Sequence, residues 1–229
     1  MPGNRAIYDR ALEQSREAAR QRRWDEALKG AVRALQEFPQ DVDARTTAAV
    51  ALFNTNKLAQ ALHILAELRA VDPENPFFLG YIAQANERNG NNAAAVEAYC
   101  ALADLHQNQR RMASVIEALR AALQLRPDMD SQRERLARLL EETNAPRDAA
   151  AEYFTLARMH YELGRLDEAA AYTETVLRLD VNSREAKELL ITIREAMARA
   201  ANDISVEDVE AKAESRPVVS SMAGMTGAL

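Results

Sequence analysis

Two histidines at equivalent positions of a repeated segment are the residues best suited to chemistry in this sequence. His106 lies in "LADLHQNQRRMASVIE", residues 102–117, and His160 lies in "LARMHYELGRLDEAAA", residues 156–171. Imidazole nitrogens ligate zinc and act as general bases. The offset of 54 residues gives both histidines the same position in a larger repeat. We therefore interpret them as a structural packing position rather than as metal ligands.

The remaining reactive side chains form no catalytic pattern. The sequence has no GxSxG, GxGxxG, phosphate-binding loop or HExxH motif. His63 stands alone on a predicted helix, and Cys100 is the single cysteine, which excludes an internal disulfide. The pair Glu141-Glu142 is typical of a solvated helix face. We expect a non-enzymatic protein with no catalytic residue, no metal site and no cofactor.

The composition favours a helical protein that does not bind nucleic acid. Hydrophobic residues make up 48% of the 229 residues, but aromatic residues only 5%, which suits helices better than strands. The formal net charge is −6, whereas a nucleic-acid binder needs a basic stripe. The sequence has no apolar run of signal-peptide or membrane-spanning type. We expect a cytoplasmic protein, and the excess of Arg over Lys suggests a GC-rich bacterial genome.

Apolar residues recur at helical spacing from about residue 5 to about residue 199, with short breaks. Pro39, Pro73 and Pro127 each follow an apolar run and mark helix ends. The first interval is 34 residues and the second is 54, and a further 54 residues lead to Val181, which follows an apolar run in the same way. The pattern predicts an all-α protein of about eleven helices joined by tight turns, with no strand.

Turn residues recur at fixed positions within these intervals. Asn56, Gly90, Asn144 and Gly164 are residue types that tolerate the left-handed backbone conformation just beyond a helix end. Five positions after each turn, and in two further units, comes a small residue, with Val115 as the larger exception: Ala27, Ala61, Ala95, Val115, Ala149 and Ala169. Small residues let two helix backbones approach closely, so this recurrence indicates packing.

These residues resemble the tetratricopeptide repeat (TPR) family, whose 34-residue unit is a pair of antiparallel helices. Residues 96–129 and 150–183 match the family pattern closely, and residues 8–41 and 42–75 match in their second helices and terminal prolines. The resemblance covers roughly residues 8–200. It implies a right-handed superhelical solenoid of antiparallel helix pairs, with a concave groove lined by the first helix of each pair.

The 54-residue intervals suggest that some helices belong to two repeats. The helix near residues 92–108 reads as the second helix of the preceding repeat and also as the first helix of the following one. The helix near residues 146–163 reads in the same two ways. We expect both helices to be shared between overlapping repeats and to interrupt the regular alternation of first and second helices.

The chain divides on this interpretation into a lead, an array, a cap and a tail: residues 1–7, 8–182, 183–202 and 203–229. The tail segment is expected to start with a short separate helix, because Ser205 and Asp208 resemble a capping box. Residues 215–229 lose the helical period. We favour a flexible end there, and the alternative is docking on a partner or on a neighbouring chain's groove.

The architecture implies a binding surface rather than an active site. The resemblance places on the groove a mixture of aromatic and polar residues, as binding surfaces have: Thr47, Val50, Phe53, Asn54, Phe77, Tyr81, Gln84 and Arg88. Phe78 is expected to pack between repeats, whereas Tyr81 is open to either role. The family's carboxylate clamp is not expected, because four of its five matching positions lack the needed group: Leu12, Arg16, Thr47, Phe77 and Tyr81.

We expect the groove to hold a protein or peptide segment, so that the chain acts as an adaptor or scaffold. The alternative is a regulatory or assembly subunit that docks through its outer faces or associates with itself. Nucleic acid and direct membrane insertion are not expected, and a homo-oligomer is compatible with the sequence.

Overall fold

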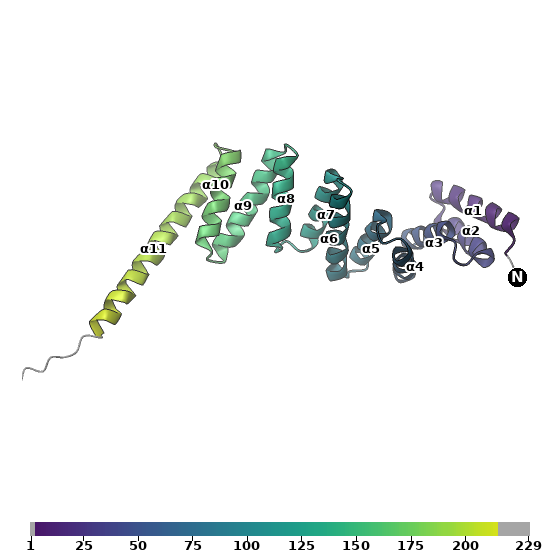
Figure 1. The fold of residues 1–229 in the computed structure, drawn as a ribbon, viewed down its shortest axis with the longest axis horizontal. Helices are drawn as coiled ribbons and strands as arrows, with labels where there is room; N and C mark the ends of the chain where they lie inside the picture. The colour runs from purple at the N-terminus through teal and green to yellow at the C-terminus, as the bar shows by residue number, and fades with distance from the viewer. Residues whose placement is uncertain (1–2, 215–229) are drawn as a thin grey trace, which may run out of the picture. The chain divides into compact units, whose positions relative to one another are not determined.

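The computed structural model describes the backbone of residues 3–214 and the side chains of residues 3–201. This part of the chain contains eleven α-helices and no strand (Figure 1), which confirms the predicted fold class. The helices fall into two compact units, Met1–Ala149 and Ala150–Leu229, and the boundary lies within one helix.

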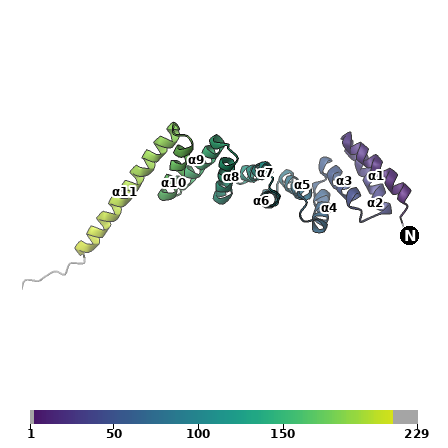
Figure 2. The same ribbon diagram turned by 45° about the horizontal axis from the view of Figure 1, so that its top comes forward.

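Most of the helices are 13 to 17 residues long, and consecutive helices are joined by short turns. The first unit contains α1 (Arg5–Arg20), α2 (Trp24–Glu37), α3 (Val42–Asn54), α4 (Leu58–Val71), α5 (Pro76–Arg88), α6 (Asn92–Asn108), α7 (Met112–Leu125), α8 (Asp130–Glu142) and the start of α9 (Pro146–Glu162). The second unit contains the rest of α9, α10 (Leu166–Leu179) and α11 (Arg184–Glu214). Neighbouring helices such as α1 and α2 lie side by side in both Figure 1 and Figure 2.

Six of the turns share one backbone geometry, built around a residue with positive φ. These residues are Arg22, Asn56, Gly90, Arg110, Asn144 and Gly164, with φ between 56° and 76°. Each turn closes the preceding helix with two hydrogen bonds. At the first turn, the N–H of Arg23 donates to the carbonyl of Ala18, and the N–H of Arg22 donates to the carbonyl of Ala19. This is the Schellman arrangement, which satisfies the last free carbonyls of a helix.

The sequence predicts four of these six positions, and the two others are arginines. Arg22 and Arg110 adopt left-handed conformations that their residue type does not favour. The surrounding hydrogen bonds and helix packing therefore determine the turn there. The small residues five positions later are all fully buried at the crossing of the paired helices: Ala27, Ala61, Ala95, Val115, Ala149 and Ala169.

The other turns begin with an extended residue rather than a left-handed one. Phe38, Asp72 and Arg126 end their helices with φ between −141° and −132°, and each is followed by proline. Proline restricts the preceding residue to extended conformations, which explains this ending. Asp180 has the same geometry before Val181, so the spacing of helix ends predicted from the prolines is confirmed.

The two turn types show which helices are shared. An ordinary pair has a left-handed turn inside it and an extended turn after it. Helix α6 has left-handed residues at both ends, Gly90 and Arg110, and it packs against both α5 and α7. Helix α9 also lies between two left-handed residues, Asn144 and Gly164. Each of the two is therefore the second helix of one pair and the first helix of the next, in agreement with the predicted sharing.

The first helices of the N-terminal pairs form one layer of the first unit. Helix α3 contacts both α1 and α5 in addition to its pairing partner. The core between α3, α4 and α5 is built from alanine, leucine and phenylalanine, and its largest members include Leu65, Leu68 and Phe78. Phe78 is 4% exposed, so the prediction that it packs between repeats is correct.

The C-terminal helix differs from the prediction. A break near residue 203 is expected from the sequence, but α11 runs without interruption from Arg184 to Glu214. The predicted capping box at Ser205 is therefore wrong, because the preceding helix simply continues through it. Ala186, Leu190 and Ile193 are buried, and α11 packs against α10. The predicted tail, residues 215–229, lies outside the described residues.

The α1–α2 pair has an unusually close crossing. A Cβ atom built on Gly30 would lie 2.8 Å from the Cβ atom of Ser15 and 3.0 Å from the carbonyl oxygen of Ala11. The Ser15 hydroxyl donates a 2.6 Å hydrogen bond to the carbonyl of Ala27 and is fully buried. Glycine at position 30 is therefore required by the approach of the two helices.

We expect Gly164→Val to lower the free energy of unfolding by about 1 kcal/mol or more, because a β-branched residue resists positive φ. The space around this glycine is open, so the loss would come from backbone strain alone. Gly80→Ala is the control, because Gly80 lies inside α5, where its added methyl would meet only Leu102 at 3.8 Å. Chemical denaturation measures both, and an unchanged Gly164→Val would contradict the assigned role of the turn.

We expect Gly30→Ala to lower the melting temperature. The opposite sign is normal inside a helix, where alanine is favoured over glycine by about 0.5–1 kcal/mol. Here the new methyl group must displace Ser15 or the α1 backbone. A melting temperature equal to or above that of the parent, measured by circular dichroism, would show that the crossing relaxes without cost.

Candidate protein-binding surface

The predicted groove residues lie on α3 and α5, which are neighbours in the layer of first helices. Thr47 and Val50 are half-buried and Asn54 is exposed on α3. On α5, Tyr81 is half-buried, and Phe77, Gln84 and Arg88 are exposed. These seven residues contribute to one surface of the first unit, which we call the α3–α5 face.

Aromatic rings gather on this face. The ring centroids of Phe77 and Tyr81 are 4.8 Å apart, and those of Tyr81 and Phe53 are 5.0 Å apart in an edge-to-face arrangement. The Phe77 and Phe78 centroids are 5.9 Å apart. Such pairs stabilise one another by about 0.5–1.5 kcal/mol beyond their buried area. Because Phe77 is 43% exposed, the cluster presents one ring edge to solvent while its base is anchored in the core.

Phe53 supports this surface from below, contrary to its predicted place on the groove. It is 3% exposed and belongs to the core between α3, α4 and α5. The Arg88 guanidinium lies 4.0 Å from the centroid of the Phe53 ring, a cation–π distance. No carboxylate among the described side chains lies within ion-pair distance of Arg88. The face therefore combines exposed aromatic area with a cation that has no acidic partner.

The polar members of the face are occupied by their own helix. The Thr47 hydroxyl donates to the carbonyl of Asp43 at 2.9 Å, and the Asn54 amide donates to the carbonyl of Val50 at 2.8 Å. Their acceptor oxygens remain available. A further ion pair joins α1 to α3, where Arg16 and Asp43 are 2.7 Å apart. Charges on the α1 side are thus mutually compensated, in contrast to Arg88.

The shared helix α6 gives the first unit a second layer of first helices, formed by α6 and α8. Arg135 of α8 pairs with Asp104 of α6 at 2.6 Å and also hydrogen-bonds Gln107. At the positions that correspond to the α3–α5 face, counted from the left-handed residues, these helices carry no aromatic residue: Glu97, Ala101, Asp104 and Asn108, then Ser131, Arg135, Arg138 and Glu142. The aromatic character is specific to the α3–α5 face.

The histidines are placed as structural residues. His160 is buried, with its ring centroid 5.2 Å from that of Tyr172. His106 is half-buried, and its Nδ1 atom has no hydrogen-bond partner among the described residues. Burial lowers the pKa of His106, and Arg111 lowers it further, while Glu117 acts in the opposite direction. The neutral form of His106 is therefore the favoured one in the folded state.

Cys100 and His63 show no sign of reactive placement. Cys100 is half-buried, and burial, followed by Asp104, raises the pKa of its thiol, so the thiolate is disfavoured. His63 is exposed on α4, with Nδ1 3.9 Å from the carboxylate of Glu67. The described residues contain no cluster of three or more His, Cys, Asp or Glu side chains able to hold a metal ion. In the same part of the chain, no helix is both long and apolar enough to cross a bilayer.

Antiparallel helix pairs stacked in layers, with an aromatic surface on adjacent first helices, define a helical-repeat scaffold for protein interaction. The chain belongs to the tetratricopeptide repeat family. Three family models, each described as a tetratricopeptide repeat, match residues 18–84, 96–129 and 150–183, which together make up more than half of the chain. The family resemblance inferred from the sequence is confirmed, and proteins of this family mediate protein–protein interactions.

Several solved structures are similar to this chain. They include pilF of Pseudomonas aeruginosa, at 16% identity and a TM-score of 0.39 over 82% of this chain and 98% of that one. MamA of Desulfovibrio magneticus has 14% identity and a TM-score of 0.39 over 71% and 98%. A thermophilic tetratricopeptide protein of Thermus thermophilus has 21% identity and a TM-score of 0.31 over 83% and 99%. A search of curated proteins finds no match.

Acidification is expected to destabilise the parent more than a His106→Gln variant. The folded-state pKa of His106 lies below its ordinary value of 6.5, so the unfolded chain binds the proton first as the pH falls. The stability contributed by neutral His106 is complete above 6.5 and is lost as the pH falls from there through the lowered folded-state pKa. Urea denaturation at pH ~7 and pH ~5 compares the two proteins, and an equal loss in both would contradict this assignment.

Proposed function

We propose that this protein is a non-enzymatic adaptor that binds a protein or peptide segment on the α3–α5 face. The observation that carries the proposal is the exposed aromatic cluster. Phe77 is 43% exposed, and its ring lies against Tyr81, which in turn lies against buried Phe53. Rigid aromatic side chains held by the core bind a partner with little loss of conformational entropy, and such residues dominate binding energies.

The chemistry of the face favours a segment with an apolar side chain near an acidic group. The apolar side chain would pack against Phe77 and Tyr81. The acidic group would approach Arg88, which lies over the Phe53 ring without a carboxylate partner among the described side chains. Thr47 and Asn54 would accept hydrogen bonds through oxygens that their own helix leaves free. Apolar anchors would supply most of the affinity, and the charge would orient the segment.

We expect Phe77→Arg, alone and combined with Tyr81→Arg, to abolish capture of a partner that the parent retains. The design compares affinity purification from the native host, followed by mass spectrometry, for the parent and both variants. The matched control is Asn108→Arg with Ser131→Arg, because these exposed residues lie on α6 and α8 and the double change adds the same charge. With the purified partner, a loss of at least about tenfold in affinity is expected, typical of a hot-spot residue.

The single variant protects the test against misfolding, since Phe77 is largely exposed whereas Tyr81 is half-buried. Melting temperatures of all variants are measured beside the binding. A partner lost by the aromatic variants and kept by the control would support the α3–α5 face. If every variant keeps the partner, binding occurs on another surface, and an assembly subunit that docks through its outer faces becomes the better description.

A further inference from the structure

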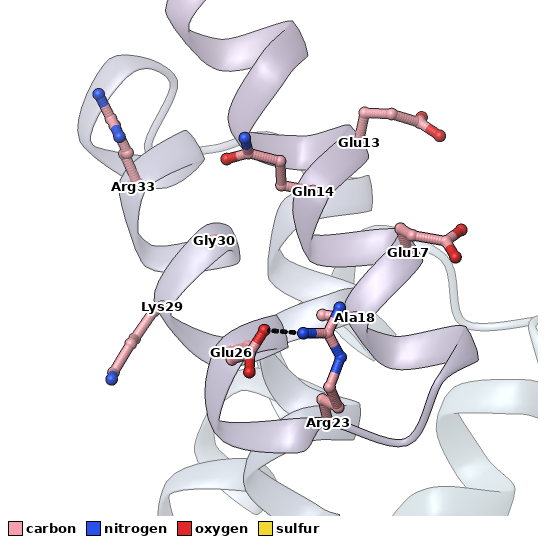
Figure 3. A pocket seen from close by; sticks show the side chains of 9 residues that line it. All are labelled: Glu13, Gln14, Glu17, Ala18, Arg23, Glu26, Lys29, Gly30 and Arg33. Atoms are coloured by element: carbon pink, nitrogen blue, oxygen red, sulfur yellow. Dashed lines mark hydrogen bonds and ion pairs between the residues drawn. The ribbon is translucent and has the colours of Figure 1, made fainter.

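The first helix pair has a face that no other described helix covers. Two adjoining hollows lie along α1 and α2, with volumes of about 660 Å³ and about 200 Å³, and both are lined by Gln14 and Arg33. Ala18 and Gly30 also line the larger hollow (Figure 3). These small residues leave room for the backbone of another helix to approach. This surface, which we call the α1–α2 end face, differs from the α3–α5 face.

The end face carries cations without acidic partners. Its carboxylates are already compensated: Glu13 and Glu17 lie 3.9 Å and 3.2 Å from Arg20, and Glu26 lies 2.5 Å from Arg23. Three other basic side chains line the two hollows: Arg10, Lys29 and Arg33. None of the described carboxylates lies within ion-pair distance of these three. Figure 3 shows Lys29 and Arg33 on the α2 side, opposite the glutamates of α1. The net character of the face is positive.

The opposite end of the chain provides a helix of complementary charge. Helix α11 has 31 residues, whereas its packing partner α10 has 14. Burial on α11 ends early: Ile193 is the last buried residue, and residues 198–201 are exposed. The helix continues through residues 202–214, a segment with five carboxylate residues and one lysine. Its length thus exceeds what α10 can cover, and its composition is acidic.

We propose that residues 202–214 of one copy bind the α1–α2 end face of a second copy. The acidic helix would offset the charge of Arg10, Lys29 and Arg33, and the floor of small residues would let it lie close to α1 and α2. Individual surface ion pairs contribute little, but a cluster of complementary charges speeds association and selects the partner. The contact joins two different surfaces, so two copies can exchange arms to close a dimer, or successive copies can extend a chain.

Sedimentation velocity of the full chain over a concentration series tests the proposal. We expect a species heavier than the monomer, and we expect its formation to weaken as salt rises because exposed charges are screened. Lys29→Glu with Arg33→Glu should weaken association at least about tenfold. Truncation after Ala201 should abolish it. The matched control, Lys57→Glu with Arg69→Glu, makes the same change in net charge at exposed positions elsewhere in the first unit.

A charge-swap experiment separates a direct contact from a general effect of charge. A second variant carries Glu207→Lys, Glu210→Lys and Glu214→Lys. Each variant alone should remain monomeric, and their mixture should recover a heavier species. Circular dichroism confirms that each variant is folded. A monomeric parent at all concentrations would overturn the proposal, as would association that survives the truncation, equal weakening by the control, or a mixture that stays monomeric.

Discussion

The left-handed residue at the turn inside each helix pair is the constraint on which the rest of the structure depends. It ends one helix, satisfies the last carbonyls through two backbone hydrogen bonds and reverses the chain within three residues. Because the following helix starts at once, the fifth residue after the turn always lies at the helix crossing, and all six of these residues are fully buried. The side chain there must be small, which accounts for the alanine repeated through the chain.

The same constraint divides the binding surfaces. A helix with left-handed turns at both ends cannot belong to a single pair, so α6 closes the series that contains α1, α3 and α5 and opens a new one with α8. The layer of first helices therefore changes at α6. The aromatic cluster of Phe77 and Tyr81 occurs before this change, and the corresponding residues of α6 and α8 are polar, charged or small. A family of similar helix pairs thus produces surfaces of different chemistry.

Charge follows a comparable division. In the first unit several ion pairs join neighbouring helices, such as Arg16 with Asp43 and Arg135 with Asp104, and these compensate one another. Arg88 over the Phe53 ring and the three cations of the α1–α2 end face are exceptions among the described side chains. Exposed cations without partners cost little in water, so they need not serve stability and remain available for recognition.

The sequence by itself determined the helix count, the positions of the helix ends and four of the six left-handed turns, because proline, glycine, asparagine and small residues act through local geometry. It also suggested the sharing of α6 and α9 through the 54-residue intervals. Only the tertiary structure decided that Arg22 and Arg110 are left-handed, that Phe53 lies beneath Arg88 rather than on the surface, and that α11 continues through Ser205. These outcomes depend on neighbouring helices and on helix propagation across a weak cap, and no local residue pattern encodes them.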